Sequence, residues 1–223
     1  MSRMLSRAAC AVCAVLAACA SSTPTVRHDQ NAGPQPEAVS VSEAAAQANQ
    51  MSPGKPGPGE EVQAVDLNGD GKPDEYNFYS KGTLGKDGQP KEGADGTMPH
   101  PLRREIDLNG DGKIDMWQWF DRDGHLEREA YDLDFDGKVD LVVYYEKGVV
   151  IRKEVFHRFS DKPDEYKYYE GGKLVRVEYD RNHDGHIDEW EYWEDGKIDR
   201  IGYDDNGDGT VDRWVKAKSE AQQ

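Results

Sequence analysis

The stretch Asp66-Leu67-Asn68-Gly69-Asp70-Gly71-Lys72-Pro73-Asp74 determines the organisation of this chain, because versions of it recur four more times. The other copies span residues 107–115, 132–140, 180–188 and 204–212. Each copy has Asp or Asn at positions 1, 3, 5 and 9 and glycine at position 6. Self-similarity at a regular period is typical of repeat architectures, in which each unit packs mainly on its neighbours.

The oxygen atoms at these positions suit a calcium ion. Calcium takes ~6–8 hard oxygen ligands at ~2.3–2.6 Å. Side chains at positions 1, 3 and 5 converge only where the chain turns sharply, which glycine at position 6 permits. Position 7 would contribute its backbone carbonyl, so its side chain is free to vary. We therefore predict about five calcium ions, one for each copy.

The predicted metal ligands are the residues at positions 1, 3, 5, 7 and 9 of the five copies. They are Asp66, Asn68, Asp70, Lys72 and Asp74; Asp107, Asn109, Asp111, Lys113 and Asp115; Asp132, Asp134, Asp136, Lys138 and Asp140; Asp180, Asn182, Asp184, His186 and Asp188; and Asp204, Asn206, Asp208, Thr210 and Asp212. The competing interpretation is a set of metal-free turns, since Asp, Asn and Gly favour hairpins. Against it, converging carboxylates repel one another unless a cation neutralises them.

The loop resembles the first nine positions of an EF-hand, and also the calcium loops of dockerin, thrombospondin type 3 and integrin-like propeller repeats. It departs from the EF-hand at position 12, where that family has a bidentate glutamate. Asn77, Gln118, Val143 and Val215 stand there, and only Glu191 fits. The resemblance to propeller-type loops implies that the aspartate at position 9 ligates directly.

A sixth, damaged copy ends at Asp164. Phe156, Arg158 and Ser160 occupy its positions 1, 3 and 5, and Asp161 replaces the glycine. A cation at Arg158 would repel a metal ion. We therefore predict that this segment is a plain β-connection and that the chain binds five ions rather than six.

The segments between the loops have the alternation of β-strands. Aromatic or β-branched residues stand two and four positions after each closing aspartate, which is a strand signal. These pairs are Tyr76/Phe78, Trp117/Trp119, Val142/Tyr144, Tyr166/Tyr168 and Trp190/Tyr192. Gly-containing turns and return strands such as 173–179 and 197–203 follow.

The predicted fold class is therefore all-β: an antiparallel β-hairpin repeat array with calcium loops on one edge and Gly turns on the other. The sequence leaves open whether it forms a curled single sheet (a solenoid) or closes as a barrel. Over residues 66–215 the hairpins resemble bacterial MORN-type repeats. Calcium loops replace every second turn, so the partners of MORN proteins do not carry over.

The N-terminus has the features of an export signal. Arg3 and Arg7 precede an apolar run over residues 8–18 that is too short to span a bilayer as a helix. The run ends at Cys19 and resembles a bacterial lipobox, which implies lipidation of Cys19 and cleavage before it; the alternative is an ordinary secretory signal. Ala20 and Ser21 follow, and the resemblance to Gram-negative lipoproteins implies an outer-membrane location, facing either the periplasm or the cell surface.

These features predict four regions. Residues 1–18 are a signal peptide. Residues 19–60 are a lipidated N-terminus and flexible Pro/Gly/Ala-rich tether, with at most a transient helical turn at 41–49. Residues 61–217 are the calcium-loop β-repeat domain, with a surface insertion at 80–100. Residues 218–223 are a disordered tail.

Composition restricts the function. The formal net charge is −16, and −18 once Arg3 and Arg7 are removed, which argues against nucleic acid and against anionic lipid surfaces. All three cysteines lie at Cys10, Cys13 and Cys19, so the mature chain would have no disulfide. The histidines share no motif and no phosphate-binding glycine loop is present, so we expect no enzyme activity.

The predicted function is a calcium-binding, membrane-tethered extracytoplasmic lipoprotein that acts as a structural or protein-interaction module. The alternative is a lipoprotein that binds glycan or cell wall through exposed aromatic rows. The expected partners are a membrane, through the lipid anchor, and an envelope protein or glycan.

Overall fold

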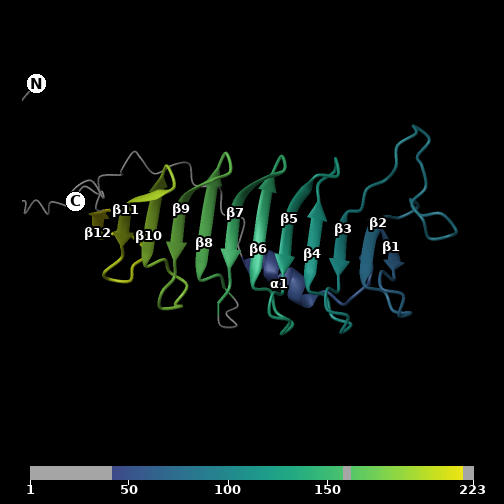
Figure 1. Cartoon of the computed structure of the whole chain (residues 1–223), viewed down its shortest axis with the longest axis horizontal. Helices are drawn as coiled ribbons and strands as arrows, with labels where there is room; N and C mark the ends of the chain where they lie inside the picture. Colours follow the sequence, from purple (N-terminus) through teal and green to yellow (C-terminus); the bar gives the residue numbers. More distant parts are fainter. Residues whose placement is uncertain (1–41, 158–161, 218–223) are drawn as a thin grey trace, which may run out of the picture. The chain divides into compact units, whose positions relative to one another are not determined.

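The computed structural model describes residues 42–157 and 162–217, which belong to one compact unit, Val39–Gln223. The signal peptide, Cys19 and the predicted tail therefore lie outside the described residues. Within them the chain forms one α-helix and twelve β-strands (Figure 1). In order they are α1 (Ser42–Gln50), β1 (Glu60–Val65), β2 (Glu75–Ser80), β3 (Arg103–Ile106), β4 (Met116–Phe120), β5 (Leu126–Tyr131), β6 (Leu141–Glu146), β7 (Val149–Val155), β8 (Glu165–Glu170), β9 (Lys173–Tyr179), β10 (Glu189–Glu194), β11 (Lys197–Tyr203) and β12 (Arg213–Lys216).

All twelve strands form one antiparallel sheet in sequence order, from β1 at one end to β12 at the other. This arrangement confirms the predicted all-β hairpin array. Of the two alternatives, the structure has the open sheet, because β1 and β12 do not pair with each other.

The connections alternate between the two edges of the sheet (Figure 1). The five acidic loops join β1 to β2, β3 to β4, β5 to β6, β9 to β10 and β11 to β12 along one edge. The tight turns and the 81–102 connection lie along the other. At Lys147-Gly148 both residues have positive φ, 51° and 78°, as in the type I′ turns that match the twist of a hairpin.

A row of alternating aromatic and arginine side chains runs across one face of the sheet. The register places aromatic residues of the even strands opposite arginines of the odd strands, and each ring carries a guanidinium within 3.4–4.7 Å of its centroid. In strand order the row is Phe78, Arg103, Trp119, Arg128, Tyr144, Arg152, Tyr168, Arg176, Tyr192 and Arg200. Cation–π contacts of this kind contribute ~0.5–2 kcal/mol each.

Buried glutamates lie beside this row, on the side nearer the acidic loops. Glu154 is fully buried, contacts Arg152 Nη2 at 2.8 Å and accepts a hydrogen bond from the Tyr144 hydroxyl at 3.1 Å. Glu178 pairs with Arg176 in the same way, and Glu105 pairs with Arg103. The charges inside this thin sheet are thus paired, which is the condition for burying them.

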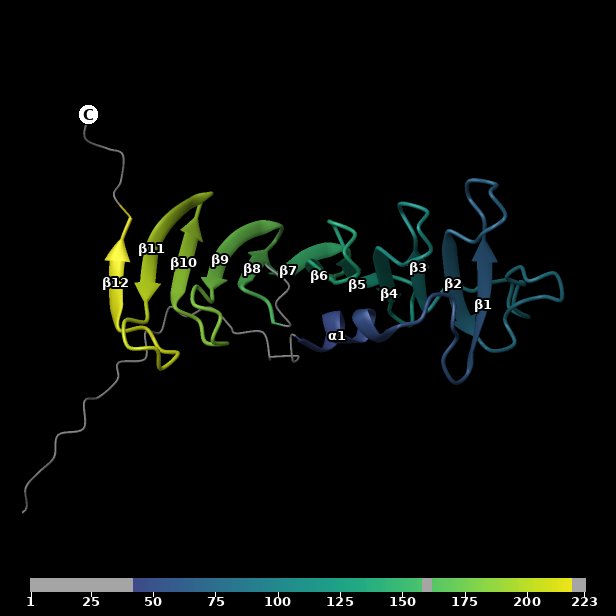
Figure 2. The same cartoon turned by 90° about the horizontal axis from the view of Figure 1, so that it is seen from below.

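Helix α1 packs on the same face of the sheet, against the central strands (Figure 2). Ala45 and Ala48 are buried in a cluster that includes Trp117, Trp119 and Val142. Asn49 Oδ1 also accepts a hydrogen bond from the backbone of Val139. These residues were expected to belong to the flexible tether, because no feature of their own composition makes a helix stable. The helix is instead stabilised by packing on the apolar surface of the sheet.

Candidate metal sites on the loop edge

The five acidic loops share one internal hydrogen-bond pattern. The position 1 carboxylate accepts the N–H of position 6, the position 3 oxygen accepts the N–H of position 5, and the position 5 carboxylate accepts the N–H of position 7. In the first loop these donors and acceptors are Gly71 to Asp66 at 2.9 Å, Asp70 to Asn68 at 2.8 Å and Lys72 to Asp70 at 2.8 Å. The same bonds recur in the other four loops. The backbone therefore fixes the ligand-type oxygens in the same arrangement five times.

The closing aspartate at position 9 accepts hydrogen bonds from the start of its loop. Asp74 Oδ2 accepts the N–H groups of Leu67 and Asn68 at 2.7 and 3.2 Å. Its Oδ1 accepts the amide of Asn68 at 3.0 Å, which brings the side chains of positions 3 and 9 together across the loop. Closing aspartates make the corresponding Oδ2 bonds in the other four loops.

The third loop brings the most carboxylates together. Asp132, Asp134 and Asp136 each offer an oxygen within 4.8 Å of the other two. Asp132 is buried, and its pKa is raised by that burial and by the negative charge of Asp136. Burial also raises the pKa of Asp115 in the second loop, with the nearby Asp107 and Asp111 adding to the effect. A cation within either loop would relieve this repulsion.

The fourth loop contains a buried oxygen without a hydrogen-bond partner. Asp180 is 5% exposed, and its Oδ1 accepts no hydrogen bond among the described residues. His183 stands at position 4 with φ 62°, where the first, second and fifth loops have a glycine that donates its N–H to position 1. A buried, unpartnered carboxylate oxygen is costly unless a cation binds it. The unpartnered Oδ1 of Asp180 therefore fits the presence of a bound cation in this loop.

Backbone hydrogen bonds connect the first loop to the second, the second to the third, and the fourth to the fifth. The N–H of Asp107, at position 1 of the second loop, donates to the carbonyl of Asp74, at position 9 of the first, at 2.8 Å. Asp132 donates to Asp115 in the same way, and Asp204 donates to Asp188. Neighbouring sets of candidate ligands are thus joined without an intervening residue.

The damaged copy keeps only the closing bond in the described residues. Arg158, Ser160 and Asp161 lie outside them. Phe156, which replaces the position 1 aspartate, is buried in the core cluster. Asp164 accepts the N–H of His157 at 2.6 Å and contacts His183 Nδ1 at 2.6 Å. Phe156 thus replaces the position 1 carboxylate, and the imidazole of His183 contacts the closing aspartate.

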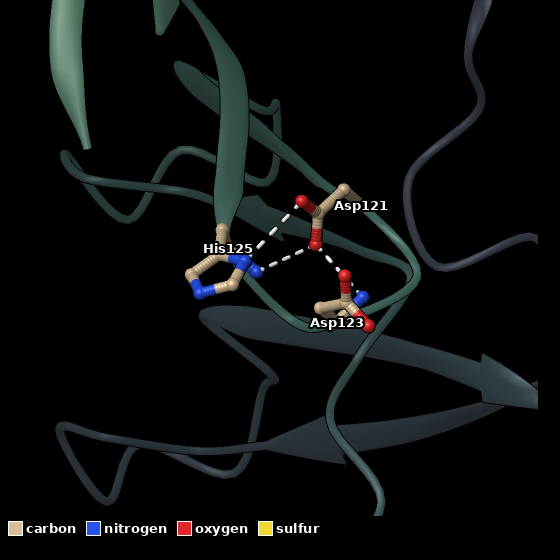
Figure 3. A group of neighbouring side chains, drawn as sticks. All are labelled: Asp121, Asp123 and His125. Carbon is tan, nitrogen blue, oxygen red and sulfur yellow. Dashed lines mark hydrogen bonds and ion pairs between the residues drawn. The ribbon is translucent and has the colours of Figure 1, made fainter. Parts of the chain in front are cut away.

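A second group of side chains of the types that bind metals, Asp121, Asp123 and His125, lies on the opposite edge, in the turn between β4 and β5 (Figure 3). Asp121 Oδ1 accepts the N–H groups of Asp123 and His125 at 2.8 and 2.9 Å, and its Oδ2 lies 3.3 Å from His125 Nδ1. The backbone bond from His125 is the main cause of the lowered pKa of Asp121. These bonds stabilise the hairpin turn, so the cluster is explained without a metal.

Comparison with known proteins agrees with the loop geometry. The sequence model of the EF-hand family matches residues 104–116, which contain the second loop. The match and the acidic clusters identify calcium-loop-type repeats. No curated protein matches the chain.

Part of the chain is similar to parts of solved structures, including the following three. One is a GtfA/B complex (17% identity, TM-score 0.33, 52% of this chain and 19% of that one). Another is a mutant of S. aureus TarM in complex with Fondaparinux, alpha-GlcNAc-glycerol and UDP (12%, 0.35, 44% and 19%). The third is the Glycosylation Associate Protein (Gap123) complex from Streptococcus agalactiae (16%, 0.25, 48% and 18%). The aligned parts span about a fifth of each of those chains.

Within the described residues, no helix has the length and apolarity to cross a membrane.

Proposed function

We propose that this chain is a calcium-binding extracytoplasmic lipoprotein whose repeat sheet serves as a structural or interaction module. The observation that carries the proposal is the loop pattern repeated five times, with carboxylate and amide oxygens fixed by backbone N–H groups. Such hard oxygens are the ligands that calcium prefers. The candidate ligands are positions 1, 3, 5, 7 and 9 of each loop, for about five ions per chain.

Bound calcium would supply positive charge where each loop concentrates carboxylates. The position 1 aspartates, such as Asp107 and Asp132, would hold the ion from the sheet side, where they are buried. The position 5 aspartates, such as Asp111 and Asp136, would hold it from the solvent side, where they are exposed. In this role calcium fastens the strand ends of successive hairpins and stabilises the array.

The test is calorimetric titration of the full chain with calcium, combined with metal analysis after dialysis. We expect about five ions per chain. Asp107→Asn and Asp180→Asn should each remove or weaken one site, because each loses a buried charge directed into a loop. Asp123→Asn, in the opposite turn, is the matched control and should leave the stoichiometry unchanged. No heat of binding with calcium would contradict the proposal.

The membrane anchor is a separate part of the proposal and rests on the lipobox residues that end at Cys19. One acyl chain holds a protein only marginally, whereas two or three make the anchor stable. Cys19→Ala should abolish the incorporation of labelled palmitate and release the protein from the membrane fraction. Retention of both in the variant would rule out the anchor.

The glycan-binding alternative is less favoured by the described residues. Sugars stack on free ring faces, whereas each aromatic residue of the alternating row has a guanidinium over its ring. We therefore take the calcium-binding module as the proposal.

A further inference from the structure

Exposed leucines mark the first three loops. Leu67, Leu108 and Leu133 stand at position 2 of their loops and are 64%, 57% and 59% exposed. The N–H of each donates to the closing aspartate, which fixes the backbone while the side chain faces solvent. Arg181 and Asp205 occupy the same position in the last two loops. The apolar residues are thus confined to one end of the loop edge.

The three leucines stand at equivalent positions of three successive loops. Their loops join successive pairs of strands along the same edge of the sheet (Figure 1). Since neighbouring strands are ~4.7–4.9 Å apart, equivalent loop positions recur at about 9–10 Å. Phe135, at position 4 of the third loop, is 44% exposed and adds a ring to this end. Single exposed leucines are ordinary, but repetition at one loop position places apolar side chains at regular intervals along this edge.

The same loops offer few ligand positions for a calcium ion. Calcium takes ~6–8 oxygens, and each loop offers ligands from only five positions. Position 12 offers no carboxylate in these three loops, where Asn77, Gln118 and Val143 stand within the strands. An ion held by one oxygen from each of these five positions would have room for an oxygen from outside the chain. A phosphate oxygen is hard and anionic, so it suits that position.

We infer that the edge formed by loops 66–74, 107–115 and 132–140 docks onto a phospholipid surface when calcium is bound. Headgroup phosphate oxygens complete the coordination, and Leu67, Leu108 and Leu133 enter the interface between headgroups and acyl chains. This inference rests on the calcium binding proposed above.

Charge explains why calcium is required. The first loop has three aspartates against one lysine, and the third has four against one, so both repel phosphate without a cation. One divalent ion brings the first loop to neutrality and leaves the third with a single negative charge. The negative charge of the whole chain then lies mainly outside this edge, so bound calcium lowers the electrostatic barrier between the leucines and the phosphates.

The experiment is co-sedimentation of the full chain carrying Cys19→Ala, which removes the acylation site, with lipid vesicles. Vesicles of phosphatidylethanolamine and phosphatidylglycerol should retain the protein in calcium and release it in chelator. Vesicles of a galactolipid, which lacks phosphate, should show no calcium-dependent retention. Equal retention with and without calcium, or on both kinds of vesicle, would overturn the inference.

The leucines are tested with Leu67→Asn, Leu108→Asn and Leu133→Asn, made singly and combined in one triple variant. Each change should weaken calcium-dependent retention about tenfold, since each removes most of the apolar area that one leucine transfers out of water. Met98→Asn is the matched control, because Met98 is 61% exposed but lies in the connection on the opposite edge. Retention unchanged in the triple leucine variant would also overturn the inference.

Calcium titration without vesicles distinguishes a failure of membrane docking from a failure of calcium binding. The triple leucine variant should bind calcium as the parent does, because no ligand is altered. If the parent binds calcium but neither vesicle, the docking inference fails and the calcium proposal stands. If the parent binds no calcium, the proposed function itself fails.

Discussion

At the scale of single residues, the loops differ in the charge they offer to a cation. The third loop has Asp134 where the other four have asparagine at position 3, so it carries one more carboxylate. Its three aspartates at positions 1, 3 and 5 already approach within 4.8 Å of one another. Calcium affinity in such loops depends on the number of charged ligands. The third loop should therefore be the strongest site.

Asp134→Asn should weaken calcium binding at the third loop about tenfold, because it removes one attractive charge close to the ion. The calcium titration of the Gly137 amide signal in NMR spectra reports this loop, and the Gly112 signal reports the unaltered second loop. Asn109→Asp should strengthen the second loop by a similar factor. Equal midpoints for Gly137 in the parent and the variant would contradict the ranking.

The buried glutamates predict a pH dependence. Burial raises the pKa of Glu154 from 4.5 to about 7, although Arg152 opposes the shift. The folded protein thus holds this proton more tightly than the unfolded chain does. The stability that the proton contributes is full below about pH 4.5 and is lost as the pH rises through about 7. This group alone therefore makes the free energy of unfolding fall over that range.

Glu154→Gln should remove this contribution, which amounts to roughly 3 kcal/mol at most for a shift of this size. The measurement is urea unfolding from pH 4.5 to 8 at saturating calcium. The parent should lose stability relative to the variant as the pH rises, whatever the offset between them from the lost ion pair. Parallel curves would show that Glu154 titrates normally.

At the scale of elements, each hairpin depends on its turn. Lys147 adopts φ 51°, a left-handed conformation that costs a lysine more than it costs asparagine. Lys147→Asn should therefore raise the free energy of unfolding by about 0.5–1 kcal/mol, since Asn-Gly is preferred in a type I′ turn. Lys173→Asn, on an exposed strand residue, is the matched control for loss of the lysine charge. A destabilised Lys147→Asn variant would contradict this account of the turn.

The sequence predicted the strands and their order because the local signals were strong. Alternation after each closing aspartate identified the outgoing strands, and short glycine turns require antiparallel neighbours. Candidate ligands were found for the same reason, since each loop is a contiguous motif. Position 9 was expected to ligate directly; its hydrogen bonds to positions 2 and 3 depend on side-chain geometry that spacing alone does not reveal.

The features that sequence reasoning missed depend on contacts across strands. Arg152 and Glu154 look like ordinary surface residues of a strand, and only the register places Arg152 between Tyr144 and Tyr168. The Arg-x-Glu pattern does recur at Arg176-Val177-Glu178, and its period of 24 residues was a usable signal. Helix α1 was missed because its stability comes from distant residues such as Trp117.

At the scale of the whole molecule, the array has little conventional core. Only 36% of the residues are hydrophobic, and the described strands form a single sheet. Carboxylates gather along one edge of that sheet, where they repel one another unless cations are bound. Backbone hydrogen bonds join the first three loops to one another and the last two loops to each other. The stability of the sheet should therefore depend on what occupies that edge.

The energy available from calcium is large compared with a typical net stability. Without position 12 glutamates in four loops, we expect dissociation constants of about 0.1–1 mM, as in other extracellular modules. At ~1 mM calcium and a dissociation constant of ~0.1 mM, one site contributes roughly 1.4 kcal/mol to folding. Five independent sites would give about 7 kcal/mol, within the ~5–15 kcal/mol by which native domains are stable.

The protein should therefore melt at a much lower temperature in chelator than in calcium. Magnesium should substitute poorly, because it requires tighter octahedral geometry and loses its waters reluctantly. The measurement is thermal unfolding of the full chain in chelator, calcium and magnesium at equal ionic strength, so that general screening is the same in all three. Asp107→Asn should reduce the calcium-dependent rise by about a fifth, and by more if the hydrogen bond between Asp107 and Asp74 couples the first two sites. Identical melting curves in the three solutions would mean that the loops are turns that hold the hairpins together without a metal.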